Sequence, residues 1–159
     1  MEKLFAPWRM EYIKQGDDKS GGCLFCDRPE DPDRRAALIV HCDDLTLVML
    51  NRFPYNSGHL MVVPRTHAAS LAALPGPEFA ALFAMVNRAV EVLKGVYRPD
   101  GFNIGMNLGR IAGAGIDQHL HVHVVPRWSG DTNFMPVIGE TKVVSEHLLA
   151  AWDSLNGKF

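Results

Sequence analysis

The sequence predicts an α+β fold: a mostly antiparallel sheet of about five strands, one main packed helix and a C-terminal helix. Five short runs of apolar or β-branched residues are typical of strands, and turn-forming residues separate most of them. These runs are residues 36–41, 45–50, 59–64, 102–108 and 119–125. Because short connections favour antiparallel neighbours, we expect these strands to form a mostly antiparallel sheet that is crossed by one helix.

The main helix is predicted to begin near Pro77, which suits a first helical turn, and to end at Gly95. Apolar residues recur between them at helical spacing and predict one packed face, formed by Phe79, Leu82, Phe83, Val86, Val90 and Leu93. A second helix is predicted over residues 145–155.

Composition indicates an ordinary globular domain. The chain has 159 residues, of which 47% are hydrophobic and 21% charged, and its formal net charge is -2. That charge gives no broad attraction to nucleic acid or to an anionic membrane, so neither partner is expected. An odd cysteine count, the Cys23-x-x-Cys26 pair and an opening segment without an uninterrupted apolar run favour a reducing compartment, the cytoplasm.

The strongest chemical signal is the alternation of His119, His121 and His123. In a strand, alternate side chains share a face, so all three imidazoles are expected on one side and Leu120 and Val122 on the other. One interpretation is a hydrogen-bonded polar face. A second is one metal bound by all three histidines, but the outer Cα atoms of a regular strand lie about 13 to 14 Å apart, whereas zinc–nitrogen bonds measure only about 2 Å.

The favoured interpretation gives the three histidines different tasks, with His121 as the nucleophile. A neutral imidazole can attack phosphorus, and its ordinary pKa of about 6.5 keeps it largely neutral at pH 7. Its other ring nitrogen must then donate a hydrogen bond, which fixes the tautomer. A neighbouring histidine on the same face can assist the leaving oxygen.

Two other motifs have a chemical and a plain interpretation. Gly109, Gly113 and Gly115 precede the histidines and could let backbone N–H groups approach a phosphate, or could form a simple flexible connection. Cys23 and Cys26 have the spacing of zinc ligands, but a pair of reduced thiols is the alternative.

Several segments together resemble the histidine triad (HIT) family. HLHVHVV (residues 119–125) resembles its His-x-His-x-His-x-x signature, NRFPYNSGH followed by LMVVPRTH (51–67) its strand-turn-strand segment, and GMNLGRIAGAG (105–115) its substrate-binding strand and loop. The resemblance covers the core motifs of residues 23–127. It implies one HIT domain over residues 1–159, with residues 128–159 as a C-terminal extension, and a homodimer that joins two sheets edge to edge.

The resemblance also implies site residues. His121 would carry the nucleotidyl adduct, His123 would contact the α-phosphate or the leaving oxygen, and His119 would support His121, partly through its carbonyl. The expected substrate-binding residues are Asn51, Asn107, Gly113, Gly115 and Gln118. A structural zinc ion would be held by Cys23, Cys26, His67 and His119, with no organic cofactor. His59 would have an indirect supporting role.

The sequence of residues 112–134 resembles the diadenosine polyphosphate phosphorylase (ATP adenylyltransferase) branch of the family. This implies cleavage of a dinucleoside polyphosphate, such as diadenosine tetraphosphate, with phosphate as the acceptor. The alternative within the family is a hydrolase of dinucleoside polyphosphates or nucleoside phosphoramidates that uses water. Two more distant alternatives are a nucleotide-binding module without turnover and a metal-dependent hydrolase.

Overall fold

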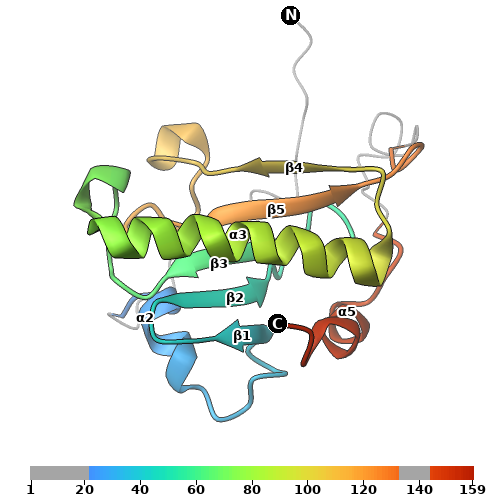
Figure 1. Ribbon diagram of the computed structural model, residues 1–159, viewed down its shortest axis with the longest axis horizontal. Helices are drawn as coiled ribbons and strands as arrows, with labels where there is room; N and C mark the ends of the chain where they lie inside the picture. Colours follow the sequence, from blue (N-terminus) through green and yellow to red (C-terminus); the bar gives the residue numbers. More distant parts are fainter. Residues whose placement is uncertain (1–21, 133–143) are drawn as a thin grey trace, which may run out of the picture.

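The computed structural model describes residues 22–132 and 144–159, which contain the expected antiparallel sheet (Figure 1). The strands are β1 (Ile39–Cys42), β2 (Thr46–Leu50), β3 (Leu60–Pro64), β4 (Gly101–Gly105) and β5 (Val122–Arg127). The α-helices are α2 (Leu24–Asp27), α3 (Gly76–Tyr97) and α5 (Leu148–Leu155), and the 3-10 helices are η1 (Arg28–Glu30), η2 (Leu71–Ala73) and η3 (Arg110–Ala112). Residues 1–21 and 133–143 of the expected domain lie outside the described residues.

The strand order is β1-β2-β3-β5-β4, and all neighbouring strands are antiparallel. After β3 the chain crosses the sheet in α3, forms the edge strand β4 and returns through the glycine-rich loop into β5 (Figure 1). The register sets His123 of β5 opposite Met61 on one side and Gly105 on the other. In the described parts of the chain, no helix is long and apolar enough to cross a bilayer.

The helix α3 covers one face of the sheet and forms the larger core with it (Figure 1). Leu82, Ala89 and Leu93 of this helix are fully buried. Leu120, Val122 and Val124 belong to the same core, as the alternation around the histidines predicts. Burial of each large aliphatic side chain contributes about 1.5 to 3 kcal/mol, so this layer is the main stabilising element.

The opposite face of the sheet has a smaller core, centred on Phe25 from α2. Phe25 packs there with sheet residues that include Ile39, Leu47, Met49 and Val63. Because Met61 also belongs to this cluster and lies opposite His123, the histidine side chains share this face. The histidines are therefore on the side of the sheet that α3 does not cover.

The start of β5 differs from the prediction, because the strand begins at Val122 rather than His119. Pairing with β3 stops at Val62–Val122, and the chain then bends toward the loop after β3. There the Leu120 N–H donates to the Ala68 carbonyl at 2.7 Å. His119 and His121 therefore lie just ahead of the strand.

The end of β5 also differs, since the strand continues through Pro126 to Arg127. Pairing with β3 ends at Leu60–Val124, so Pro126 has a strand neighbour only in β4. A proline lacks an N–H to donate and is tolerated where a strand is locally an edge.

The main helix is longer than predicted and runs through Gly95 to Tyr97. The end is set by Arg98, which has a left-handed backbone (φ 49°) and precedes Pro99, a residue that disfavours the helical conformation before it. Phe79 and Phe83, predicted to face the core, are each 41% exposed and contact one another instead. The real buried stripe includes Met85.

Three smaller boundaries were also predicted wrongly. The first strand starts at Ile39 because Asp33 holds the Ala36 and Ala37 amides in a turn. The fourth strand ends at Gly105, where its pairing with β5 ends at His123. The C-terminal helix starts at Leu148, since His147 caps it by accepting from the Leu149 N–H.

Candidate active site and metal centre

His121 is buried at the start of β5 and has its Nδ1 atom 3.0 Å from the carbonyl oxygen of His119. A carbonyl oxygen only accepts, so Nδ1 carries the ring proton and Nε2 has the lone pair. Burial lowers the pKa of His121, while the hydrogen bond to His119 acts in the opposite direction. The neutral ring therefore presents an unprotonated Nε2, the form that a nucleophilic imidazole needs.

His123 lies beside His121, with their ring centroids 5.0 Å apart and nearly perpendicular. Its Nδ1 atom is 3.0 Å from Nε2 of His59, a fully buried residue. The Nε2 atom of His123 is buried and has no hydrogen-bond partner among the described residues. Burial and the neighbouring His121 lower the pKa of His123 to about 4. This unpaired nitrogen is the polar atom best placed to meet a substrate.

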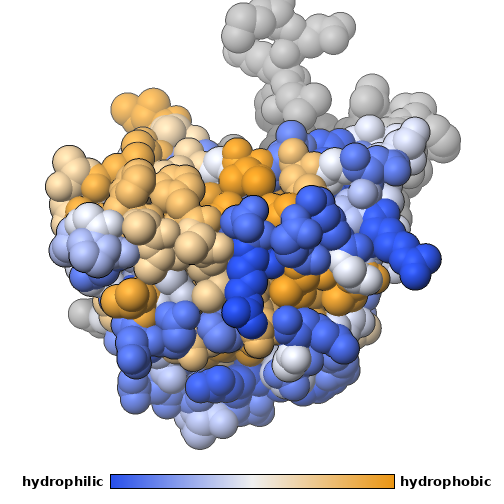
Figure 2. Space-filling view, in the orientation of Figure 1, coloured by the Kyte–Doolittle hydropathy of each residue, from blue (hydrophilic) through white to orange (hydrophobic). Residues whose placement is uncertain are grey.

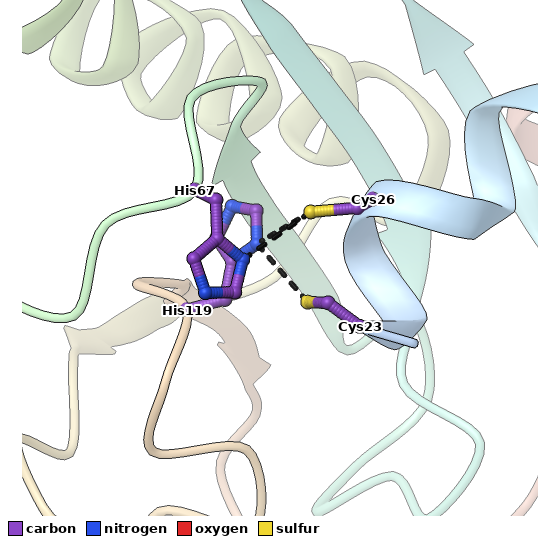
Figure 3. A group of neighbouring side chains, drawn as sticks. All are labelled: Cys23, Cys26, His67 and His119. Atoms are coloured by element: carbon purple, nitrogen blue, oxygen red, sulfur yellow. Dashed lines mark hydrogen bonds between the residues drawn. The ribbon is translucent and has the colours of Figure 1, made fainter. Parts of the chain in front are cut away.

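His119 lies with its ring toward the cysteine pair (Figure 3). Its Nε2 atom donates to the Pro64 carbonyl at 2.8 Å, so Nδ1 is unprotonated. Nδ1 lies 3.3 Å from Cys23 Sγ and 3.6 Å from Cys26 Sγ. His67, in the loop after β3, has its Nδ1 atom 3.3 Å from Cys26 Sγ.

The ligand atoms of Cys23, Cys26, His67 and His119 all lie within 4.8 Å of one another (Figure 3). This group contains neither His121 nor His123, so it gives no support to one metal held by the whole trio. Burial raises the pKa of the Cys26 thiol, and so does the neighbouring Cys23.

Phe25 joins the two clusters and was not identified from the sequence. Its ring is 5.5 Å from the His119 ring and 5.1 Å from the His121 ring, measured between centroids. It is 2% exposed and lies between the two cysteines in the chain. An apolar residue within a Cys-x-x-Cys pair is too common to indicate such a contact.

The expected substrate-binding residues have fewer contacts. Asn51 follows β2, and its Oδ1 accepts from the Phe53 N–H at 2.9 Å. Asn107 is half-buried in the loop after β4, whereas Gly115 and Gln118 are exposed. The side chains of Asn51, Asn107 and Gln118 make no hydrogen bond with the three histidines within the described residues.

The glycine-rich loop has its own internal hydrogen bonds. Gly109 and Gly113 have positive φ angles of 82° and 96°, which explains the choice of glycine there. The Gly113 N–H donates to the Arg110 carbonyl at 2.9 Å, and the Ala114 N–H to the Gly109 carbonyl at 3.3 Å. These two amides therefore stabilise the loop, and the phosphate cradle expected from Gly109, Gly113 and Gly115 stays a prediction.

His59 has a more direct contact than the sequence indicated, because it hydrogen-bonds His123 itself. Its backbone also joins the neighbouring segment, since the Asn51 N–H donates to the His59 carbonyl. Glycine before this histidine is the only nearby signal in the sequence, and Gly58 has φ +69° with the Tyr97 ring against it.

Two features together define the class of protein: an α+β fold built on an antiparallel sheet, and a histidine trio where the chain enters the inner strand β5. A family model described as the HIT domain matches residues 34–130. The AP-4-A phosphorylase of Mycobacterium tuberculosis is 42% identical over 155 residues, covering 93% of this chain and 79% of that protein. The chain therefore belongs to the HIT family.

Two further relatives bear on the site. The asymmetrical bis(5'-nucleosyl)-tetraphosphatase of Schizosaccharomyces pombe is 32% identical over 87 residues, covering 55% of this chain and 47% of that protein. The solved structure of a Zn-bound histidine triad family protein from Mycobacterium smegmatis matches with a TM-score of 0.69 and 27% identity, over 87% of this chain and 94% of that one.

Proposed function

We propose that this protein is a nucleotidyltransferase that cleaves dinucleoside polyphosphates by phosphorolysis, through a covalent adduct on His121. The observation that carries the proposal is the hydrogen bond from His121 Nδ1 to the His119 carbonyl, which leaves a lone pair on Nε2 beside His123. The similarity to the mycobacterial AP-4-A phosphorylase supports diadenosine tetraphosphate as the substrate.

In the first step, the Nε2 lone pair of His121 forms a bond to the α-phosphorus of diadenosine tetraphosphate. The bond from that phosphorus to the bridging oxygen breaks, and its electron pair leaves with ATP. In the second step, an oxygen of inorganic phosphate attacks the same phosphorus. The N–P bond breaks, its electron pair returns to Nε2, and the adenylyl group leaves as ADP.

The test is to supply diadenosine tetraphosphate with and without phosphate and to separate the products. We expect ADP and ATP with phosphate and a stalled adduct, seen as added adenylyl mass, without it. His121→Asn should lower turnover by several orders of magnitude, as loss of a nucleophile does in other enzymes. His41→Gln is the matched control and should keep full activity. His41 lies on β1, and its side chain hydrogen-bonds Asp43.

The second candidate is a hydrolase that uses water as acceptor, favoured by the similarity to the fission yeast tetraphosphatase. It shares the first step, but water attacks the adduct and the product is AMP instead of ADP. Equal AMP release with and without phosphate would establish the hydrolase and rule out phosphorolysis.

We infer that Asn51 and Asn107 contact the substrate, the first at the ribose and the second near the phosphates. The Oδ1 atom of Asn51 already accepts from Phe53, so its Nδ2 is the group that would donate to a ribose hydroxyl. Asn107 follows Gly105 by two residues, and Gly105 pairs with His123. Gly113, Gly115 and Gln118 would contact phosphate, and the Gly113 amide would first have to leave the Arg110 carbonyl.

We infer that Cys23, Cys26, His67 and His119 hold a structural zinc ion. In a tetrahedral site a sulfur–nitrogen edge measures about 3.5 Å, from Zn–S bonds of about 2.3 Å and Zn–N bonds of about 2.0 Å. The measured separations of 3.3, 3.3 and 3.6 Å fit such an edge. The Pro64 carbonyl orients His119, as outer contacts do for metal-bound histidines.

We also propose a cytoplasmic homodimer, formed by one HIT domain over residues 1–159 of each chain. The three cysteines are unpaired, and two of them face histidines, which suits a reducing compartment. Purine nucleotides are the expected ligands, with no nucleic acid or membrane as partner.

A further inference from the structure

We propose that His59 is a positioning residue that keeps the ring proton of His123 on Nε2, where it can donate to a phosphate oxygen. The inference rests on the proposed function for its catalytic meaning. Its basis is a chain of hydrogen bonds that starts at a backbone amide, passes through two buried imidazoles and ends at an atom with no partner among the described residues.

The chain starts at the Tyr55 N–H, which is 3.0 Å from Nδ1 of His59. A backbone N–H can only donate, so Nδ1 of His59 must be an acceptor without a proton. His59 is fully buried, and a charged ring would place a second N–H against the Tyr55 amide. His59 is therefore neutral, and its single ring proton is on Nε2.

The next step passes this constraint to His123. Nε2 of His59 and Nδ1 of His123 are 3.0 Å apart, so the proton of the first is donated to the lone pair of the second. A neutral His123 then has its own proton on Nε2. That atom is buried and has no partner among the described residues, so it is aimed at a ligand rather than at the protein.

The two neighbouring rings thus present opposite chemistry. His121 presents a lone pair at Nε2, because its Nδ1–H donates a hydrogen bond to the His119 carbonyl. His123 presents an N–H at Nε2. When His121 attacks the α-phosphorus and the bridging P–O bond breaks, the electron pair stays on the leaving polyphosphate oxygen. His123 donates a hydrogen bond to a phosphate oxygen at this bond and keeps its proton. No net proton transfer is therefore needed.

The Tyr55 ring also lies against this pair. Its centroid is 4.7 Å from that of His59 and 5.8 Å from that of His123. Tyr55 therefore contributes its amide to the chain and its ring to the packing around it, which limits the rotation of both imidazoles.

The first test needs no variant: long-range ¹H–¹⁵N spectra of the labelled protein report which ring nitrogen carries the proton. We expect Nε2–H for His59 and His123 and Nδ1–H for His121. A His123 ring with its proton on Nδ1 would overturn the inference. This measurement is made without substrate, so it stands whether or not the protein forms an adduct.

The second test compares two amide replacements. His59→Gln can reach the Nε2 position and donate to His123, whereas His59→Asn reaches only the Nδ1 position and can accept from Tyr55. We expect Gln to keep most of the rate of His121 adduct formation and Asn to lose about tenfold, less than the roughly 10²-fold effect of deleting a donor outright. Equal rates for the two variants, with both folded, would contradict the inference.

A double-variant cycle separates this role from a general structural one. If His59 acts through His123, the His59→Asn change should have no further effect in a His123→Ala background. Losses that multiply would mean that His59 acts elsewhere and would overturn the inference. If the wild-type protein forms no adduct at all, the proposed function fails, and the tautomer spectra still decide the hydrogen-bond chain.

Discussion

At the scale of single residues, the site depends on which nitrogen of each imidazole carries a proton. Backbone groups determine the position of each ring proton, because a backbone N–H can only donate and a carbonyl oxygen can only accept. The His119 carbonyl fixes His121, the Tyr55 amide fixes His59, and the Pro64 carbonyl fixes His119. Under the proposed function, these three similar rings have three different tasks: attack on phosphorus for His121, orientation of His123 for His59, and metal binding for His119.

The lowered pKa of His123, about 4, predicts a pH dependence of stability. The unfolded ring titrates near about 6.5, so between the two values the unfolded chain binds more protons than the folded one. Stability is then unaffected by His123 above about pH 6.5 and falls as the pH drops, by at most about 1.4 kcal/mol per pH unit from this ring.

Urea unfolding at about pH 7 and about pH 5 checks this prediction. His123→Asn should show a shallower loss of unfolding free energy than the wild type, because it lacks the titrating ring. Identical slopes for the two proteins, or a His123 ring resonance that titrates near about 6.5, would show that the folded pKa is not lowered.

At the scale of elements, α2 is short but packs directly against His121, the proposed nucleophile. Phe25 of α2 contacts the rings of both His119 and His121, while Cys23 and Cys26 form the candidate metal group together with His67 and His119. The proposed metal site and the proposed active site are thus connected by an aromatic ring, in addition to the chain between residues 119 and 121.

We predict that Phe25→Ala destabilises the protein by about 3 to 5 kcal/mol, the usual cost of removing a buried phenylalanine. Adduct formation should slow as well, because the His121 ring loses a packing surface and its orientation. Denaturant unfolding and single-turnover assays measure the two effects. Leu24→Ala is the matched control, since Leu24 is 41% exposed and should change stability by less than about 0.5 kcal/mol. A Phe25→Ala protein with wild-type stability would refute the packing role.

The elements also show which features a sequence can predict. Strands and α3 were found because their apolar periodicity reflects a core that every variant of the fold must bury. The start of β5 was missed because it depends on a bond to Ala68, far away in the sequence. Phe79 and Phe83 fit the helical period, yet they lie at the edge of the buried face of α3 and stay partly exposed.

The site divides in the same way. Alternation predicted the shared face of the histidines, and the family resemblance supplied His67 as the fourth neighbour of the cysteines. The His59–His123 bond could not be derived, because no spacing rule relates residues so far apart in the sequence. His59 precedes β3, and the register of β3 against β5 brings it to His123. Sequence also could not predict that the Gly113 amide bonds within its own loop, to the Arg110 carbonyl.

At the scale of the whole molecule, the two faces of the sheet have different roles. The α3 face supplies most of the buried core, and the opposite face carries the histidines and the metal-ligand group. The proposed zinc ion joins α2, the loop after β3 and the lead into β5, which are distant in sequence. It therefore stabilises the face that has little hydrophobic core of its own.

Removal of the metal is predicted to lower the melting temperature without unfolding the α3 side. Binding to the folded state alone stabilises by RT ln(1 + [Zn]/Kd), so the shift should grow with added zinc. Metal analysis should give one zinc per chain, and Cys26→Ser should abolish binding, whereas Cys42→Ser should retain it. A melting temperature that is insensitive to chelation, in protein shown to be free of metal, would contradict a structural metal.

The outer edge of β4 is the interface that we expect for the proposed homodimer. Strand β4 ends the sheet, and its residue Ile104 is 50% exposed. In Figure 2 apolar surface gathers over the first half of α3, where Phe79 and Phe83 are exposed, and polar surface covers the second half. The open edge of β4, where Ile104 is exposed, can pair with a strand of another chain. A second copy fits best, because a two-fold axis pairs β4 with itself in the antiparallel sense.

We predict that Ile104→Lys converts the proposed dimer into a monomer, because pairing of the two β4 edges would bring like charges together, and a lysine on an edge strand normally prevents such pairing. Sedimentation velocity at micromolar concentration measures the outcome. Leu45→Lys is the matched control: Leu45 is 42% exposed beside the other edge of the sheet, and its variant should stay dimeric. A wild-type monomer, or an Ile104→Lys dimer of unchanged affinity, would mean that the sheet edge is not the interface. Activity in the monomeric variant would further show that each subunit has a complete site.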